Sequence, residues 1–96
     1  MDEQDKINEQ LTALDAAEAA LSSDDPLSPY VHDQIERLIS SLQLQLLAVA
    51  TSVTVPPLSA AETANMQSAL TSLDTAVRQS AGATQILQAA TTLAAA

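Results

Sequence analysis

Apolar residues recur every three or four positions along most of the chain, which is the pattern of amphipathic helices. The first such stripe runs through Ile7, Leu11, Leu14, Ala17 and Leu21. The segment "SSDDPLSPY" that follows is rich in Ser, Asp and Pro, residues that favour turns over a continuing helix. The pattern therefore predicts a first helix over about residues 3–22.

A second helix is predicted over about residues 29–51. Ser28 suits the N-cap position and Pro29 suits the first helical position. The inward stripe comprises Val31, Ile35, Leu38, Leu42, Leu46, Val49 and Val53. A second apolar face comprises Ile39, Leu44 and Leu47, so we expect this helix to be buried on more than one side.

Two features of this region leave alternatives. The run "LQLQL" also fits the period of a strand, but the helical spacing continues through it from Val31, which favours a helix. The segment "TSVTVPPLS" is rich in β-branched residues and contains two prolines. We therefore expect an extended linker over about residues 52–59.

The C-terminal part contains a third helix over about residues 60–81, opened by a capping box of Ser59 and Glu62. Its inward stripe comprises Met66, Leu70, Leu73 and Val77. Gly82 is the only glycine, and it could end this helix before a fourth over about residues 84–95. Alternatively, one helix continues to the end of the chain, and the pattern favours neither reading.

The inward positions of that last segment are Ile86, Leu87, Ala90 and Leu93. Together these patterns predict an all-α fold, a small antiparallel bundle of three or four helices, with residues 1–96 as a single domain. Its core would be thin, because many apolar positions are alanine and the chain has a single aromatic residue. A thin core often gains stability from a partner.

Charge is distributed unevenly between the two halves of the chain. The formal net charge is −9, and ten of the twelve acidic residues lie within residues 2–36. The three basic residues each follow an acid by four positions, in the pairs Asp2–Lys6, Asp33–Arg37 and Asp74–Arg78. This spacing supports helices and leaves no basic patch, so direct binding to nucleic acid is disfavoured.

The sequence contains no cysteine, which excludes disulfides and thiolate chemistry. Its start, "MDEQDKINEQ", is acidic and polar, unlike a signal peptide. The uncharged window over residues 38–55 is interrupted by Ser, Thr and Gln and lacks aromatic or basic flanks, so a membrane span is unlikely. We expect a location in the cytoplasm or within a protein assembly.

Few residues suggest catalysis or metal binding. His32, the only histidine, lies one helical turn from Glu36 and beside Asp33, but two ligands do not make a metal site. Asp24 and Asp25 lie in a turn-forming segment and are expected to be solvated. No glycine-rich phosphate loop is present, and no serine has an evident activating base. We therefore expect no enzyme activity, no cofactor and no metal.

The weakly charged C-terminal half suggests protein contacts. Only three charged residues follow Leu38, and charge is depleted at the buried centres of protein interfaces. We therefore expect a structural or assembly subunit that acts through helix–helix contacts, as a homo-oligomer or as part of a larger complex such as a virion or scaffold. The expected interface residues are Leu42, Leu46, Leu47, Leu70 and Leu73.

Two alternatives stay open. The acidic first helix could bind a basic site on another protein and inhibit it by imitating nucleic acid, through Asp5, Glu9, Asp15 and Glu18. A small molecule could instead bind within the Leu-rich centre of the bundle. Binding through leucines depends weakly on salt, whereas binding through carboxylates falls steeply as salt rises.

Overall fold

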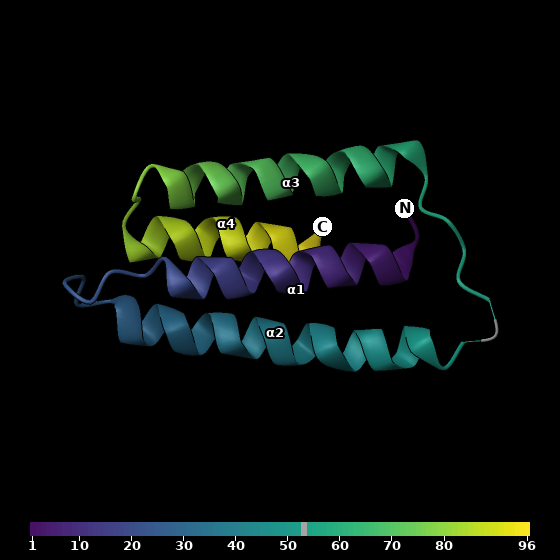
Figure 1. Ribbon diagram of the computed structural model, residues 1–96, viewed down its shortest axis with the longest axis horizontal. Helices are drawn as coiled ribbons and strands as arrows, with labels where there is room; N and C mark the ends of the chain where they lie inside the picture. Colours follow the sequence, from purple (N-terminus) through teal and green to yellow (C-terminus); the bar gives the residue numbers. More distant parts are fainter. Residues whose placement is uncertain (53) are drawn as a thin grey trace.

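The computed structural model describes residues 1–52 and 54–96, and these residues form four α-helices. The helices are α1 (Glu3–Ala19), α2 (Ser28–Ala50), α3 (Ala60–Arg78) and α4 (Ala83–Ala95). They lie along the long axis of a flat molecule measuring 46 × 24 × 15 Å (Figure 1). The all-helical prediction is confirmed, and residues 60–96 contain two helices instead of one.

Helix α1 begins with a capping box that was not predicted. The Asp2 carboxylate accepts the backbone N–H of Asp5 at 2.8 Å, and the Asp5 carboxylate accepts the N–H of Asp2. Because Asp2 serves as the cap, Lys6 pairs with Glu3 at 3.5 Å and not with Asp2 as expected. The N-terminus also contacts the linker before α3, where the N–H of Leu58 donates to the carbonyl of Met1.

The loop between α1 and α2 is held by its own polar side chains. Helix α1 ends at Ala19, three residues before the predicted end, since the backbone turns at Ala20. The prediction that Ser28 caps α2 is wrong: Leu27 is the N-cap residue, and it makes no side-chain cap. Ser28 is instead buried, and its hydroxyl donates to the carbonyl of Ser22 at 2.5 Å. Pro29 lies in the first turn, as expected.

The predicted start of α3 is confirmed, whereas its end differs from the prediction. The capping box is confirmed, with the N–H of Glu62 donating to Ser59 Oγ at 3.1 Å and the Glu62 carboxylate accepting the N–H of Ser59. The helix ends at Arg78, and Gly82 is not its C-terminal cap. Ser80, with φ of 53°, adopts the left-handed conformation, and the N–H of Ala81 donates to the carbonyl of Ala76. Gly82 has ordinary extended angles and is the N-cap of α4.

The core lies where α1 and α4 meet between the two outer helices. Both α2 and α3 pack against α1 and α4, whereas no contact joins α2 to α3 among the described residues. The buried apolar side chains are Ile7, Leu14, Ala17, Val31, Ile35, Ile39, Leu42, Met66, Ala69, Leu73, Ala83, Ile86, Ala90 and Leu93. Most belong to the predicted stripes. The remaining described stripe residues, such as Leu11, Leu38 and Val77, pack partly buried against this core.

A polar residue inside the core was not predicted. Gln10 on α1 is buried, and its Nε2 donates to the carbonyl of Leu93 at 2.8 Å. Helix α4 is the shortest of the described helices, and it ends about halfway along the long axis of the molecule (Figure 1). The Gln10 amide therefore attaches the end of α4 to α1, through a carbonyl that also accepts the N–H of Ala96.

The second apolar face of α2 is not covered as expected. Ile39 is buried, but Leu44 and Leu47 are 70% and 63% exposed. They lie on the side of α2 that points away from the bundle, where this chain supplies no further helix to cover them. The segment "LQLQL" is helical, and residues 54–59 contain no helix. Val53, predicted to extend the stripe and to lie in the linker, is outside the described residues.

Candidate functional site

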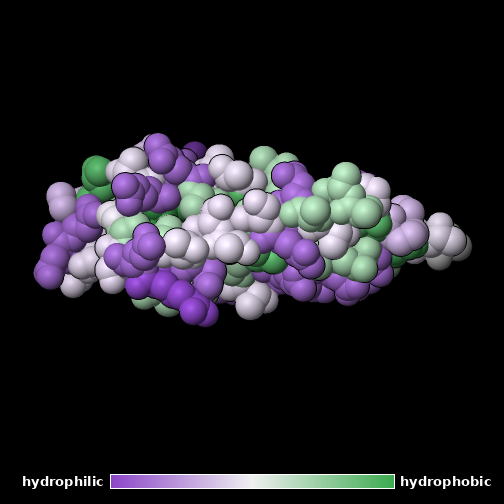
Figure 2. Space-filling model, turned by 90° about the horizontal axis from the view of Figure 1, so that it is seen from above, coloured by the Kyte–Doolittle hydropathy of each residue, from purple (hydrophilic) through white to green (hydrophobic). Residues whose placement is uncertain are grey.

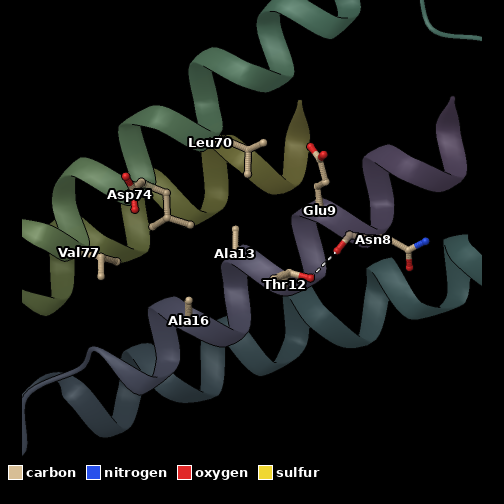
Figure 3. A pocket seen from close by; sticks show the side chains of 9 residues that line it. Asn8, Glu9, Thr12, Ala13, Ala16, Leu70, Asp74 and Val77 are labelled. Carbon is tan, nitrogen blue, oxygen red and sulfur yellow. Dashed lines mark hydrogen bonds between the residues drawn. The ribbon is translucent and has the colours of Figure 1, made fainter. Parts of the chain in front are cut away.

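A groove with a mainly apolar lining lies between α1 and α3. We call it the α1–α3 groove; its volume is about 500 Å³. Its apolar lining consists of Ala13, Ala16, Leu70, Leu73 and Val77, and its polar lining consists of Asn8, Glu9, Thr12 and Asp74. In Figure 3, Ala13 and Ala16 lie on the side of α1 that faces α3, whereas the Asn8 side chain points away from α3. The groove is open because small alanines on α1 face larger residues on α3.

The groove has an acidic rim on both sides. Glu9 lies on the α1 side and Asp74 on the α3 side, and both residues are exposed. Asp74 also pairs with Arg78 at 2.9 Å, as the sequence spacing predicted. This exposed pair is weak, so a partner's basic group can compete for the carboxylate. Thr12 donates its hydroxyl to the carbonyl of Asn8 at 3.0 Å, as drawn in Figure 3.

The five predicted interface leucines are divided among three environments. Leu42 and Leu73 are buried in the core of the chain itself, so little of either side chain can meet a partner. Leu46 and Leu70 are partly buried against that core, and Leu70 faces the α1–α3 groove. Leu47 lies on the exposed outer face of α2. The groove therefore brings Leu70 and Leu73 together, whereas the three leucines of α2 lie elsewhere.

The four acids proposed for a basic partner do not form one face. Asp5 belongs to the capping box of α1, Glu9 lines the groove beside α3, and Glu18 contacts His32 of α2. Asp15 is exposed, and no side chain in the described part of the chain forms an ion pair with it. Glu9 and Glu18 thus face opposite neighbours of α1. Sequence spacing could not separate these roles, because it shows which residues are acidic but not which helices lie beside them.

A second cluster of polar side chains joins α1 to α2. His32 Nε2 lies 2.9 Å from Glu18 Oε2 and 3.9 Å from Glu36 Oε1, so the expected His32–Glu36 neighbours gain a third member. Burial and the nearby Glu36 carboxylate raise the pKa of Glu18 to about 7, although the Coulomb effect of His32 opposes the rise. We call Glu18, His32 and Glu36 the α1–α2 polar cluster. Sequence analysis assigned Glu18 to an acidic face for a basic partner and did not predict its contact with His32, which lies fourteen residues later.

Of the two adjacent acids in the loop between α1 and α2, Asp24 and Asp25, only Asp25 differs from the expectation of a solvated turn residue. Asp25 is not simply a solvated turn residue, because its carboxylate accepts the N–H of Leu27 at 2.9 Å and the N–H of Ala83 at 2.9 Å. These backbone donors, that of Ala83 first, lower the pKa of Asp25 below its usual value. Asp24 is exposed, and only its backbone N–H bonds, to Ser22 Oγ. Asp25 therefore has a structural role between distant segments.

The surface alternates in character over short distances. In Figure 2, which views the molecule from above, hydrophobic residues form small patches between hydrophilic ones.

Within residues 1–52 and 54–96, no helix combines the length and the apolar character that crossing a bilayer requires. Comparison with protein-family models, curated proteins and solved structures finds no match to this chain.

Proposed function

We propose that this chain is a non-catalytic assembly subunit that binds an amphipathic helix of another protein in the α1–α3 groove. The proposal includes an antiparallel bundle, in which helices consecutive in the chain run in opposite directions and α1 and α3 form the two walls of the groove. One observation carries it: an apolar recess lies open between two helices and has a carboxylate on each rim. Such a groove suits a helix that presents apolar residues at every third or fourth position.

The dimensions of the groove fit this kind of partner. Its lining extends from Asn8 to Ala16 on α1 and from Leu70 to Val77 on α3. At a rise of about 1.5 Å per residue, these walls are about 10–12 Å long, or roughly two helical turns. Two turns of a docked helix present two or three apolar anchors. A partner contact of this size would add apolar burial to a core that contains many alanines.

The charges indicate which helix would bind. Glu9 and Asp74 favour a partner with Lys or Arg beside its apolar stripe, and the whole chain adds long-range attraction through its net charge of −9. A second copy of this chain fits the groove poorly, because it contains only three basic residues and repels another copy. We therefore assign the groove to a basic amphipathic helix of a different protein.

The other functions considered have less support. A ligand pocket usually holds a few polar groups that converge on the bound molecule. Here the Thr12 hydroxyl already donates to a carbonyl of its own helix, so the α1–α3 groove offers a small molecule little specific recognition. Imitation of nucleic acid needs a row of available carboxylates. Asp5 and Glu18 are engaged within the chain, which weakens that alternative.

Self-association is the second candidate, and a specific observation favours it. Leu44 and Leu47 are exposed and one helical turn apart on α2. Light scattering coupled to size-exclusion chromatography, at low and high salt, tests this candidate. A dimer that disappears in the Leu44→Ser/Leu47→Ser double variant would support the outer face of α2 as a contact between copies. A monomer of 10.0 kDa at all concentrations would exclude it.

The groove is tested with synthetic helices used as probes. A labelled peptide with Leu at helical spacing and Lys elsewhere is titrated by fluorescence anisotropy, alongside a peptide with the same Leu stripe and Glu in place of Lys. We expect the Lys peptide to bind and the Glu peptide not to bind. Equal binding of both peptides would contradict the proposal that the acidic rim of the groove selects a basic helix.

Two matched pairs of variants separate groove binding from simple attraction between charges. Leu70→Asp adds a negative charge inside the groove, and Leu44→Asp adds the same charge on the outer face of α2. We expect Leu70→Asp to weaken binding tenfold or more, the loss that truncating a central anchor commonly produces. Non-specific attraction would instead strengthen binding in both variants.

The second pair avoids any loss of folding at Leu70, which is partly buried. Ala16→Lys places a positive charge at an exposed position in the groove, and Ala48→Lys places one at an exposed position on α2. Both variants change the net charge equally. Weaker binding only in Ala16→Lys supports the groove, and equal effects of the two substitutions would refute it.

A further inference from the structure

The α1–α2 polar cluster contains an arrangement that its internal contacts do not explain. Glu18 is 12% exposed in its side chain, and its Oε2 atom is fully buried. That oxygen lies 2.9 Å from His32 Nε2, yet the pair does not meet the geometry of a hydrogen bond, and no other described residue supplies one. A buried carboxylate oxygen without a hydrogen bond is costly, and a partner that binds it would offset that cost.

The charges in the cluster point to the nature of that partner. Two carboxylates and one imidazole converge, and the candidate ligand atoms all lie within 4.8 Å of one another. Two ionised carboxylates this close repel each other, and a cation between them would remove that repulsion. No lysine or arginine lies among the ion-pair partners of Glu18 or Glu36 in the described residues. His32 alone supplies the positive charge, and only when it is protonated.

The distances fit ligands of one small metal ion. A nitrogen and an oxygen bound to Zn²⁺ at about 2.1 Å, with a tetrahedral angle between them, lie about 3.4 Å apart. The observed separations from His32 Nε2 are 2.9 Å to Glu18 Oε2 and 3.9 Å to Glu36 Oε1, on either side of that value. Because His32 and Glu36 are each 52% exposed, solvent can reach a fourth coordination position and small side-chain rotations are unhindered.

We propose that Glu18, His32 and Glu36 form a binding site for a divalent transition-metal ion, with Zn²⁺ as the ion that fits their donor atoms. An imidazole and two carboxylates match zinc or a similar first-row ion better than Mg²⁺ or Ca²⁺, which prefer oxygen ligands alone. The ion links the end of α1 to the first half of α2 across the intervening loop. Its role is structural stabilisation, independent of the groove.

The first test is calorimetric titration of the full chain with ZnCl₂, together with thermal unfolding with and without the metal. We expect one ion per chain, a higher Tm in zinc and reversal by a chelator. Mg²⁺ at the same concentration is expected to produce neither effect. Binding of several ions with no change in Tm would mean scattered surface carboxylates and would overturn the proposal.

Variants locate the site. His32→Gln and Glu18→Gln are expected to weaken zinc binding tenfold or more, whereas Asp33→Asn, an exposed acid beside His32, is expected to bind within twofold of the unmodified chain. His32→Gln changes a half-exposed residue, so the variant remains folded, as circular dichroism would verify. Undiminished one-to-one binding in His32→Gln would overturn the proposal.

Nuclear magnetic resonance adds a direct readout, because His32 is the only histidine and its imidazole signals need no separate assignment. Equimolar Zn²⁺ is expected to shift these signals in the unmodified chain and in Asp33→Asn. Imidazole signals that do not respond to zinc would exclude His32 as a ligand.

Discussion

The carboxylate of Asp25 accepts a hydrogen bond from the backbone N–H of Ala83 at 2.9 Å, so the loop between α1 and α2 caps the beginning of α4. Helix α4 needs this contact because its own N-cap residue is Gly82, which has no side chain to donate or accept. The two residues are 58 positions apart. A turn of the first helical hairpin therefore fixes where the last helix starts.

Removal of this cap is expected to loosen the first turn of α4. In Asp25→Ala, the N–H of Ala83 loses its acceptor, and hydrogen exchange at the start of α4 should accelerate several-fold. Asp24→Ala is the matched control, because only the backbone of Asp24 forms a hydrogen bond in the loop. Equal exchange rates in the two variants would show that the Asp25 carboxylate does not hold α4.

Acid is expected to destabilise the fold through two capping carboxylates. Backbone donors lower the pKa of both Asp25 and Glu62, so the unfolded chain binds protons more readily than the folded chain. Their stabilising contribution is complete above the ordinary carboxyl pKa and is lost as the pH falls through the lowered values. Thermal unfolding measured from pH 6 to pH 2 tests this dependence.

The Asp25→Asn/Glu62→Gln double variant should show a weaker loss of Tm below pH 4 than the unmodified chain, since neither capping group titrates. Asp15→Asn/Asp24→Asn removes two other acids and serves as the control for net charge. If both double variants reduce the loss of Tm at low pH equally, general charge repulsion, and not capping, determines how stability depends on acid.

Gln10 is expected to be the polar residue whose loss costs the most stability. Gln10→Ala leaves a cavity and removes the hydrogen bond between α1 and the carbonyl of Leu93, so the free energy of unfolding should fall by about 2–4 kcal/mol. Gln4→Ala, at an exposed position of the same helix, should change it by less than about 0.5 kcal/mol. Urea unfolding measures both. A loss below 1 kcal/mol in Gln10→Ala would contradict the attachment of α4 through Gln10.

The turn between α3 and α4 is expected to favour glycine at position 80 more than at position 82. Ser80 has a φ of 53°, which is strained for a residue with a side chain. Ser80→Gly should therefore stabilise the chain by about 0.5 kcal/mol, after allowance for the added freedom of the unfolded chain. Destabilisation by this substitution, measured by urea unfolding, would contradict the left-handed assignment.

Gly82→Ala is the informative comparison. A methyl group at Gly82 would lie 3.8 Å from Asp25 Oδ2, an ordinary contact, so we expect a change within about 0.5 kcal/mol. A fall of more than 1 kcal/mol in the free energy of unfolding would show that the turn requires glycine at position 82.

Local patterns predicted the helices well because their signals lie within a few residues of one another. The capping box of Ser59 and Glu62 spans three positions and is present in the structure. The buried stripes through Ile7, Ile35 and Leu73 also follow from spacing alone. Even the loop after α1 was recognised from its composition, although its first residues were assigned to the helix.

Contacts between distant segments could not be predicted in the same way. The bond from Ala83 to Asp25 and the approach of Glu18 to His32 depend on which helices become neighbours. Spacing also placed both Leu42 and Leu47 in the predicted interface. In the structure, Leu42 is buried in the core and Leu47 is exposed. The α1–α3 groove arises from small residues on one helix opposite larger ones on another, which no single stripe reveals.

The most direct test of the proposed function is a map of where a basic helix binds. The Leu/Lys peptide is added to the ¹⁵N-labelled chain, and amide chemical shifts are followed by nuclear magnetic resonance. The account predicts the largest changes at residues 9–16 of α1 and 70–77 of α3, on the two walls of the groove. Changes spread over all exposed acids, or centred on Leu44 and Leu47 of α2, would contradict it.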